Sequence, residues 1–393
     1  MDHAVNREAR EPLFTPAFIL LGVADLVYFT AVGVSIHSLP LFVTGPVGSD
    51  EAGAGLAFGA FALMALLLRP FAGRLADQIG RRPLLVAGAL VGAAGLALMP
   101  LAETLALVVA FRLLQGVGEA AFFVAGFAML ADLAPRARTG EALSYNSLGL
   151  YLGLAMGPPL GAMVLAASGF TMTWVVAAIL MVLAAGMALL LSETHTPDPA
   201  TADGARHLIH LPAVPPALGL MASILAAGGF MAFASLHSTR IGMANTSAAL
   251  TIYGLVVVIC RLTLARVPDR LPALPLGAAS LAAIAGGLAL VAAWTTPAGL
   301  LLGTAVMAVG VAFSTPAFFT AVFSTAAPHQ RGAAAGTASA ALDLGLGLGP
   351  LLLGLIARDH GVAAALAVAA FLALVGAVWT WSLVLRRGGA TPG

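Results

Sequence analysis

Residues 147–160 read SLGLYLGLAMGPPL, and residues 339–352, which lie 192 positions later, read SAALDLGLGLGPLL. The two stretches match at eight positions, and each contains one Gly-Pro pair at the same place. In a similar way, SIHS at residues 35–38 recurs 200 positions later as SLHS at residues 235–238. Matches among alanine, leucine and glycine arise often by chance, so the Gly-Pro and Ser-x-His-Ser pairs carry most of the weight. We therefore predict two halves built on one shared pattern.

The composition places both halves in a membrane. Of the 393 residues, 60% are hydrophobic and only 9% are charged, whereas about a quarter of the residues of a soluble domain are charged. The apolar runs are long enough for helices that cross a bilayer, and alternation typical of barrel strands is absent from them. The predicted spans are 17–43, 53–72, 83–100, 104–131, 141–167, 170–191, 217–239, 246–265, 273–293, 298–323, 333–357 and 361–385. This predicts an all-α membrane protein with twelve transmembrane helices in two pseudo-symmetric six-helix bundles.

The longest polar break suggests where the two bundles are joined. It predicts an N-terminal bundle at 1–191, a cytoplasmic linker at 192–216 and a C-terminal bundle at 217–393. All 18 basic residues are arginines, and most of them, Arg69 included, fall on or near one side of the predicted membrane. Because short arginine-rich loops stay in the cytoplasm, we expect both termini there, in a multi-pass protein of the plasma (inner) membrane. The linker histidines, which we expect to be solvated, are His195, His207 and His210.

Several function classes are disfavoured by the composition. The net charge of +1 gives no electrostatic footprint for a nucleic-acid partner. The sole cysteine, Cys260, excludes an intramolecular disulfide and a cysteine-based metal site. We find no nucleophile beside a base and no nucleotide-binding loop, so an enzyme, a metal and a cofactor are not expected. The expected partners are the lipid bilayer, a small organic substrate and protons, and the chain is expected to function as a monomer.

Four ionisable residues interrupt the predicted spans, namely Asp25, Arg112, Glu119 and Asp343. A charge at the centre of a bilayer costs roughly 3 kcal/mol, so we expect each of them to face a cavity or to be paired. Gln115 lies between Arg112 and Glu119 on the same helical face, and the two charges are about 10 Å apart along the axis. Because the embedded acids outnumber the embedded arginine by three to one, the expected substrate is neutral or cationic.

These residues predict how transport could be coupled to protons. If a carboxylate releases its proton only when substrate binds, the two occupancies exclude each other and exchange follows. Asp25 or Asp343 is a candidate proton site, and Glu119 with Arg112 is another. The alternatives are a structural ion pair between Arg112 and Glu119 and a solvated Asp25 near the cytoplasmic mouth.

Two histidines and a tyrosine are further candidates for the same cavity. His37 and His237 occupy matching places near the outer ends of the first and seventh predicted spans, where they could bind substrate or carry protons. The alternative is a pair of ordinary interfacial histidines, and two histidines alone do not predict a zinc site. Tyr151 is expected to line the cavity, where its ring would favour flat or cationic substrates; packing against another helix is the alternative.

The fifth predicted span carries a regular stripe of small residues. Gly149, Gly153, Gly157 and Gly161 recur every four positions, which predicts one smooth face for close helix packing. Pro158 and the proline after it remove backbone donors and are expected to bend the helix.

The loop predicted after the second span reads GRLADQIGRRP from Gly73 to Pro83. Gly73 is expected to let helices approach closely, and Gly80 can adopt the positive φ of a tight turn. Asp77, which lies between arginines, can pair locally or cap a helix N-terminus. The simpler alternative is a basic cytoplasmic loop that only determines topology.

Taken with the repeat and the twelve spans, this loop makes the whole chain resemble the major facilitator superfamily. The resemblance implies a cytoplasmic latch in which Asp77 engages the end of the eleventh helix while nearby arginines help to hold the cytoplasmic side closed. The second half keeps only an eroded copy of this loop, at residues 265–270. The implied latch residues are Gly73, Asp77, Gly80, Arg81, Arg82 and Arg136.

Two further stretches resemble motifs of a particular branch. Residues 112–121, RLLQGVGEAA, are similar to the superfamily's fourth-helix motif, whose arginine is implicated in proton transfer, although Glu119 replaces the usual small residue. Residues 149–161 are similar to the Gly-Pro motif of exporters, particularly drug/proton antiporters. The motif residues are Gly153, Gly157, Pro158 and Gly161. The resemblance implies proton-coupled efflux of a drug or metabolite by alternating access, with the proton gradient as energy source and no other cofactor.

Two other functions stay open on the sequence. One is a proton-coupled or facilitative importer of a sugar or metabolite, which the Gly-Pro motif disfavours. The other is a membrane scaffold or receptor that does not transport. A scaffold would have little reason to keep Asp25, Glu119 and Asp343 within its spans.

Overall fold

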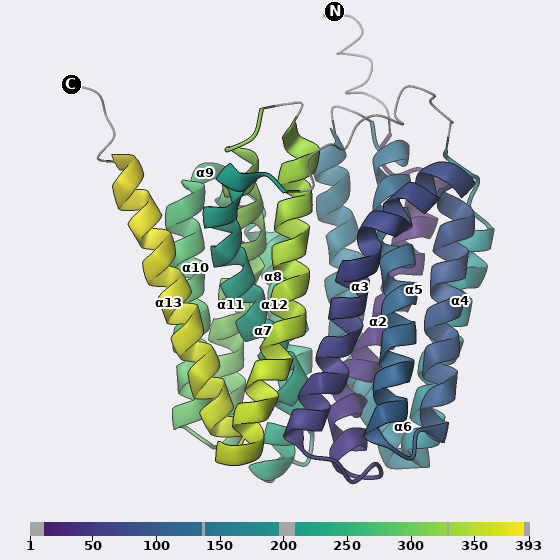
Figure 1. The fold of residues 1–393 in the computed structure, drawn as a ribbon, viewed down its shortest axis with the longest axis vertical. Coiled ribbons are helices and arrows are strands. Elements are labelled where there is room, and N and C mark those ends of the chain that lie inside the picture. Colours follow the sequence, from purple (N-terminus) through teal and green to yellow (C-terminus); the bar gives the residue numbers. More distant parts are fainter. Residues whose placement is uncertain (1–11, 136–137, 196–208, 328–329, 389–393) are drawn as a thin grey trace, which may run out of the picture. The chain divides into compact units, whose positions relative to one another are not determined.

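The computed structural model describes residues 12–135, 138–195, 209–327 and 330–388 (Figure 1). Within these ranges every regular element is a helix, which confirms the all-α prediction. The long helices of the first half are α2 (Pro16–Thr44), α3 (Glu51–Ile79), α4 (Arg81–Leu98), α5 (Leu105–Leu133) and α6 (Thr139–Leu189). The second half contains α7 (Val214–Arg240), α8 (Ala248–Thr263), α9 (Val267–Arg270), α10 (Ala273–Ala293), α11 (Pro297–Phe323), α12 (Arg331–His360) and α13 (Val362–Gly388). Two short 3-10 helices, η1 (Met99–Leu101) and η4 (Leu211–Ala213), complete the order.

Ten of the helices in the described ranges are long and apolar enough to cross a membrane. One of them, α6, has 51 residues, which would extend to about 76 Å if straight, more than twice the thickness of a hydrocarbon core of about 30 Å. Gly169 interrupts α6 with a φ of 75° and a ψ of −177°. The predicted twelve spans are reached when α6 is counted as two helices that meet at Gly169 and the 16-residue apolar helix α8 is included.

The break in α6 lies where the predicted spans 141–167 and 170–191 meet, and not at the proline pair, where only a bend was expected. The backbone keeps helical φ and ψ through Pro158 and leaves them at Gly169. Glycine adopts a positive φ without the steric cost that a Cβ atom brings, so it is the residue at which the chain can reverse.

Contacts divide the chain into two compact units. Unit 1 comprises Met1–Ser38 and Met64–Pro199, and unit 2 comprises Leu39–Leu63 and Ala200–Gly393. The end of α2 and the beginning of α3 therefore pack with the second half of the chain. The linear domain boundaries from the sequence stay a prediction.

The glycine stripe of α6 packs against α2 inside unit 1, as its spacing predicts. A Cβ atom added at Gly153 would lie 2.8 Å from the carbonyl oxygen of Leu26, and one added at Gly157 would lie 2.5 Å from the Cα atom of Gly33. At Gly161 the nearest atom would be Cα of Val34, at 3.3 Å. Only glycine lets the two backbones approach this closely.

Unit 2 repeats this arrangement with its own first and fifth helices. α12 packs along α7, and α10 lies beside α11 and α13 (Figure 1). A Cβ atom at Gly345 would lie 2.7 Å from the carbonyl oxygen of Met221, and one at Gly349 would lie 3.0 Å from Cα of Leu225. Gly345 and Gly349 are the residues that the repeat aligns with Gly153 and Gly157, so the two halves share their packing as well as their sequence pattern.

Candidate functional site

The four embedded ionisable residues all lie inside the protein. The exposed fractions are 4% for Asp25, 5% for Arg112, 6% for Glu119 and 1% for Asp343. None of these four faces lipid, which agrees with the high cost of a charge in hydrocarbon. Asp25, Arg112 and Glu119 belong to unit 1, and Asp343 belongs to unit 2.

Arg112 is held by neighbours in unit 1. Its Nη1 donates a hydrogen bond to Oε1 of Gln115, one turn along α5, at 2.6 Å. The same nitrogen donates to Oγ of Ser35 on α2 at 3.3 Å. The predicted common face of Arg112 and Gln115 is therefore present, and Ser35 is a partner that the sequence analysis did not identify.

Glu119 lies farther along α5, beside an aromatic pair. The ring of Tyr28 stacks on Phe122 with the ring centroids 3.8 Å apart and the planes 6° from parallel. The Tyr28 hydroxyl interacts electrostatically with Glu119, although within the described ranges no geometric hydrogen bond forms at the hydroxyl. Arg69 and Arg112 both attract the Glu119 carboxylate. Two cations and a phenol thus act electrostatically on Glu119.

Arg69 corrects the charge count made from the sequence. Arg69 lies half-buried in α3, with its guanidinium carbon 4.2 Å from the centroid of the Phe123 ring, and its expected place near the cytoplasmic side stays a prediction. Because Arg69 and Arg112 both act on Glu119, unit 1 contains two cations against the two carboxylates Asp25 and Glu119. The excess of acids behind the expected cationic substrate does not hold in unit 1. The sequence did contain a signal that Arg69 lies inside a span, because Arg69 stands in an apolar run between Leu68 and Pro70.

Asp25 on α2 has a different environment. Its carboxylate takes a side-chain hydrogen bond from Asn146 of α6, and the charge of Glu119 acts on it. Among the described residues, no cation contributes to its electrostatic environment. The structure therefore brings Asp25, Arg112, Gln115 and Glu119 into one cluster, to which Asn146 belongs although the sequence analysis missed it.

The remaining cavity candidates are distributed over both units. His37 on α2 is fully buried in unit 1, and Tyr151 on α6 is half-buried there. Asp343 on α12 and His237 on α7 are buried in unit 2. The functional roles of these four residues stay predictions. In the part of the chain that the structure describes, no group of three or more histidine, cysteine or acidic side chains could hold a metal ion.

The segment predicted as a loop after the second span is mostly helical. Gly73 to Ile79 form the last turns of α3, and α4 starts at Arg81, so that Gly80 alone separates the two helices. Gly80 has a φ of 99°, which confirms the expected positive φ. No close approach is present at Gly73 among the described residues, where an added Cβ atom would meet no atom within 4 Å.

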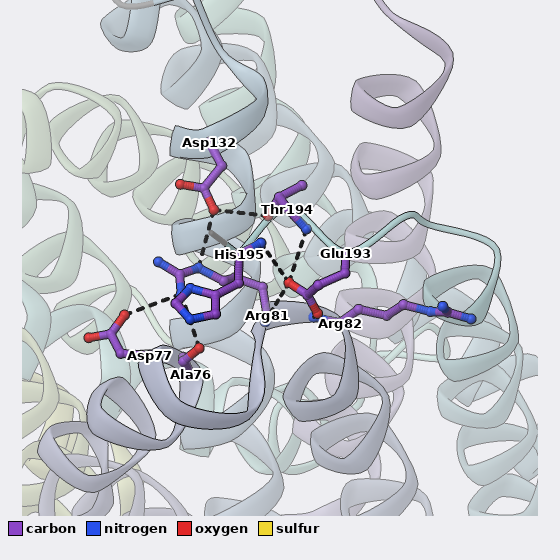
Figure 2. A network of polar contacts seen from close by, with 8 residues as sticks. All are labelled: Ala76, Asp77, Arg81, Arg82, Asp132, Glu193, Thr194 and His195. Carbon is purple, nitrogen blue, oxygen red and sulfur yellow. Dashed lines mark hydrogen bonds and ion pairs between the residues drawn. The ribbon is translucent and has the colours of Figure 1, made fainter. Parts of the chain in front are cut away.

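Arg81 joins three segments at this end of unit 1 (Figure 2). Its Nε donates to Oδ2 of Asp132 at the end of α5, at 3.1 Å. Its Nη1 pairs with Oδ1 of Asp77 at 3.3 Å and also contacts Nδ1 of His195. Asp77 therefore pairs locally, and its predicted contact with the eleventh helix stays a prediction. Arg136 lies outside the described residues.

Glu193 caps the beginning of α4 from a position more than a hundred residues away. Its carboxylate accepts the backbone N–H groups of Arg81 and Arg82, each at 3.0 Å. It also accepts the N–H groups of Thr194 and His195, at 3.0 and 2.8 Å (Figure 2). A carboxylate at a helix N-terminus satisfies free donors and interacts favourably with the helix dipole. This cap attaches the beginning of the linker to α4.

The linker histidines are not simply solvated as expected. His195 contacts Arg81, and His210 is buried in unit 2, where its backbone N–H donates to Oγ1 of Thr337 at 2.9 Å. The ring Nε2 of His210 also bonds to the carbonyl oxygen of Thr325 at 3.1 Å. His207 lies outside the described residues. His195 and His210 are not solvated because the fold places them next to residues at the ends of helices. Arg81 contacts His195, and Thr325 and Thr337 bond to His210.

We expect Glu193→Gln to destabilise the protein by about 1 kcal/mol, the usual scale of a lost helix cap. Partial burial raises the pKa of Glu193, but four backbone N–H groups outweigh it and hold the pKa below its ordinary value of 4.5. The carboxylate therefore contributes stability above pH 4.5, and the contribution is lost as the pH falls through the lower folded-state pKa. Thermal unfolding of wild type and variant in detergent should differ at pH 7 and converge in acid. Glu103→Gln, at an exposed site, is the control; equal stability of Glu193→Gln and wild type at pH 7 would contradict the capping role.

Comparisons with known proteins agree with this architecture. The sequence profile described as Major Facilitator Superfamily matches residues 21–337 and, in an overlapping second match, residues 249–392. An uncharacterised transporter of this type from Salmonella typhimurium is 27% identical over 381 residues, which is 93% of this chain and 96% of the relative. Another, from Burkholderia mallei, is 27% identical over 391 residues, with 94% and 95% covered.

Solved transporter structures have the same fold. The human organic anion transporter MFSD10 superposes with a TM-score of 0.71 and 19% identity, and the comparison covers 93% of this chain and all of that one. A point mutant of the nucleoside transporter NupG gives a TM-score of 0.79 at 16% identity, with 93% and 99% covered. Identities this low show the fold alone. With the family profile spanning most of its length, this chain belongs to the major facilitator superfamily of multi-pass membrane transporters.

Proposed function

We propose that this transporter exports a small organic molecule in exchange for protons, by alternating access between its two halves. The observation that supports this proposal most directly is the buried cluster in unit 1, in which Asp25 and Glu119 lie with Arg69 and Arg112. The proposed location is the plasma (inner) membrane, with both termini in the cytoplasm, since the arginine-rich segments would then lie inside.

The two carboxylates suit different tasks in such a cycle. Asp25 is hydrogen-bonded to an amide, so it can gain or lose a proton without breaking an ion pair. Glu119 is attracted by two guanidinium groups, so an arriving substrate that disturbs either cation changes the field at Glu119 and, through Glu119, at Asp25. Proton and substrate occupancy are then linked, and the linkage is reciprocal. The proton gradient is the proposed energy source, without another cofactor.

The charge balance of the cluster bears on the proposed substrate. When Arg69 is counted, the described cluster of unit 1 has two arginines and two carboxylates. It therefore has no excess of negative charge that would attract a cation. We therefore place neutral organic molecules first and cationic ones second. The solved relatives include an organic anion transporter and a nucleoside transporter, so an anionic probe belongs in any screen.

Inside-out membrane vesicles from an efflux-deficient host test the proposal. Respiration acidifies their interior, and a pH-sensitive dye reports when an added compound releases protons from it. The probes are ethidium and tetraphenylphosphonium as cations, chloramphenicol as a neutral molecule and fluorescein as an anion. At least one probe should release protons only when the protein is present. Nigericin collapses the pH gradient. If the vesicles still accumulate the probe after nigericin is added, transport is not coupled to protons and that part of the proposal is wrong.

Import is the second candidate, and the likeness to the nucleoside transporter NupG suggests a nucleoside as the probe for it without indicating a direction of transport. Cells that lack their own nucleoside permeases provide the discriminating assay. Uptake of labelled uridine that depends on this protein would establish import. A scaffold function would instead be supported if Asp25→Asn, Glu119→Gln and Asp343→Asn together left the phenotype of the host unchanged.

A further inference from the structure

A pocket of about 360 Å³ lies in unit 2 where three chain segments meet. It is an open pocket lined by the end of α7, the turn after α10 and the junction between α12 and α13. The residues that line it include His237, Arg240, Thr295, His360, Val362 and Ala363. We call it the α13 pocket. None of the described residues lining it is acidic.

The beginning of α13 supplies backbone donors to this pocket. The N–H of Gly361 bonds to the carbonyl oxygen of Ala357, and that of Ala365 bonds to Gly361. The N–H groups of Val362 and Ala363 belong to the first helical turn, whose donors have no acceptor within a helix. α13 has 27 residues, so its N-terminus carries the partial positive charge of a full helix dipole. Such an end favours an oxyanion.

His237 is an independent indication of a ligand at this place. The side chain is 3% exposed, and its Nε2 atom is buried with no hydrogen-bond partner in the described part of the chain. A buried polar atom without a partner is destabilising. A ligand oxygen in the pocket would give this nitrogen the partner that the described residues do not supply.

The charged side chains next to the pocket form ion pairs. Arg240 forms an ion pair with Glu51 through one of its nitrogens, which leaves further N–H groups on the same guanidinium. His360 also lines the pocket, and the exposed pair of Arg358 and Asp359 next to it in the chain is neutral in sum. Hydrogen-bond donors therefore line the pocket, and the acid Glu51 is engaged by Arg240.

We propose that the α13 pocket binds an oxyanion, a carboxylate or a phosphate group. The N–H groups of Val362 and Ala363 and the imidazole of His237 bind its oxygens, while Arg240 and His360 supply further N–H donors. This assigns His237 to a site inside unit 2 and does not depend on the proposed proton exchange. A free small anion and the phosphate of an anionic lipid headgroup have this chemistry in common, and the experiment separates them.

The first arm measures thermal unfolding of the purified full-length protein in nonionic detergent with inorganic phosphate as the probe, against sodium chloride at equal ionic strength. Phosphate should raise the melting temperature of the wild type. His237→Phe, which keeps a ring and removes its nitrogens, and His360→Gln should each need at least about tenfold more phosphate for the same shift. Arg74→Gln removes one exposed positive charge in unit 1 and is the matched control that should respond like the wild type.

The second arm reconstitutes the protein in lipid nanodiscs of phosphatidylglycerol and phosphatidylcholine, extracts it and measures the retained lipid by native mass spectrometry. Preferential retention of phosphatidylglycerol by wild type and Arg74→Gln, lost in both histidine variants, identifies a lipid headgroup as the ligand. A phosphate response without lipid preference identifies a free anion. If His237→Phe does not fold, His360→Gln decides alone. The proposal is overturned if neither arm distinguishes the histidine variants from the wild type.

Discussion

Glu119→Gln is expected to reduce proton-driven transport to the level of vesicles without the protein, while expression and melting temperature stay close to those of the wild type. Glutamine has nearly the same shape as glutamate and can still bond to its neighbours, but it cannot take up or release a proton. It also leaves Arg69 and Arg112 facing a neutral group. Asp25 would then be the remaining carboxylate in the described cluster of unit 1.

The measurement is proton release from inside-out vesicles on addition of whichever probe the wild type exports. Glu103→Gln makes the same chemical change in the exposed turn before α5 and should transport like the wild type. A second readout is the binding of the same probe at constant pH, which Glu119→Gln should retain if the residue acts in coupling. Full proton-driven export by Glu119→Gln would exclude Glu119 from the coupling step.

Gly157→Ala is expected to destabilise the protein by about 1–3 kcal/mol, the scale of overpacking in a closely packed interior. The added Cβ atom would lie 2.5 Å from Cα of Gly33 and would also collide with the carbonyl oxygen of Thr30. Both are backbone atoms, which cannot turn aside as a flexible side chain can. Relief therefore requires α2 and α6 to move apart along their whole contact.

Gly186→Ala is the matched control, because it makes the same change in the same helix at an exposed site where no described atom lies within 4 Å. Alanine has the higher helix propensity, by up to about 1 kcal/mol in water, so this variant should be as stable as the wild type or more so. Thermal unfolding in detergent compares the two. A Gly157→Ala protein as stable as Gly186→Ala would mean that α2 and α6 do not pack as closely as described.

Some features of the site were predictable because they depend on local pattern or on the solvent. The four-residue spacing of Gly153, Gly157 and Gly161 puts them on one helical face whichever helix covers it. Gly80 could be assigned a positive φ because it separates two helical runs. Asp25 and Glu119 were expected inside, since hydrocarbon excludes charge wherever the helices lie.

Other features required knowledge of which helices are neighbours. Arg69 looked like one of the arginines near the membrane surface, and only the packing of α3 in unit 1 brings it over Phe123 and near Glu119. Asn146 becomes a partner of Asp25 because α6 lies against α2. Glu193 caps α4 across 112 positions of sequence, a pairing that no spacing rule encodes.

The amino-acid sequence alone was therefore sufficient to predict the membrane environment, the twofold repeat and which carboxylates are buried. These features depend on composition and periodicity, which reflect the surrounding solvent and the geometry of a single helix. The partners of those carboxylates, the cap that Glu193 forms on α4 and the α13 pocket depend on the three-dimensional arrangement. Hydrogen bonds and ion pairs act over a few ångströms in space, and only the packed helices bring residues that are far apart in the chain within that distance.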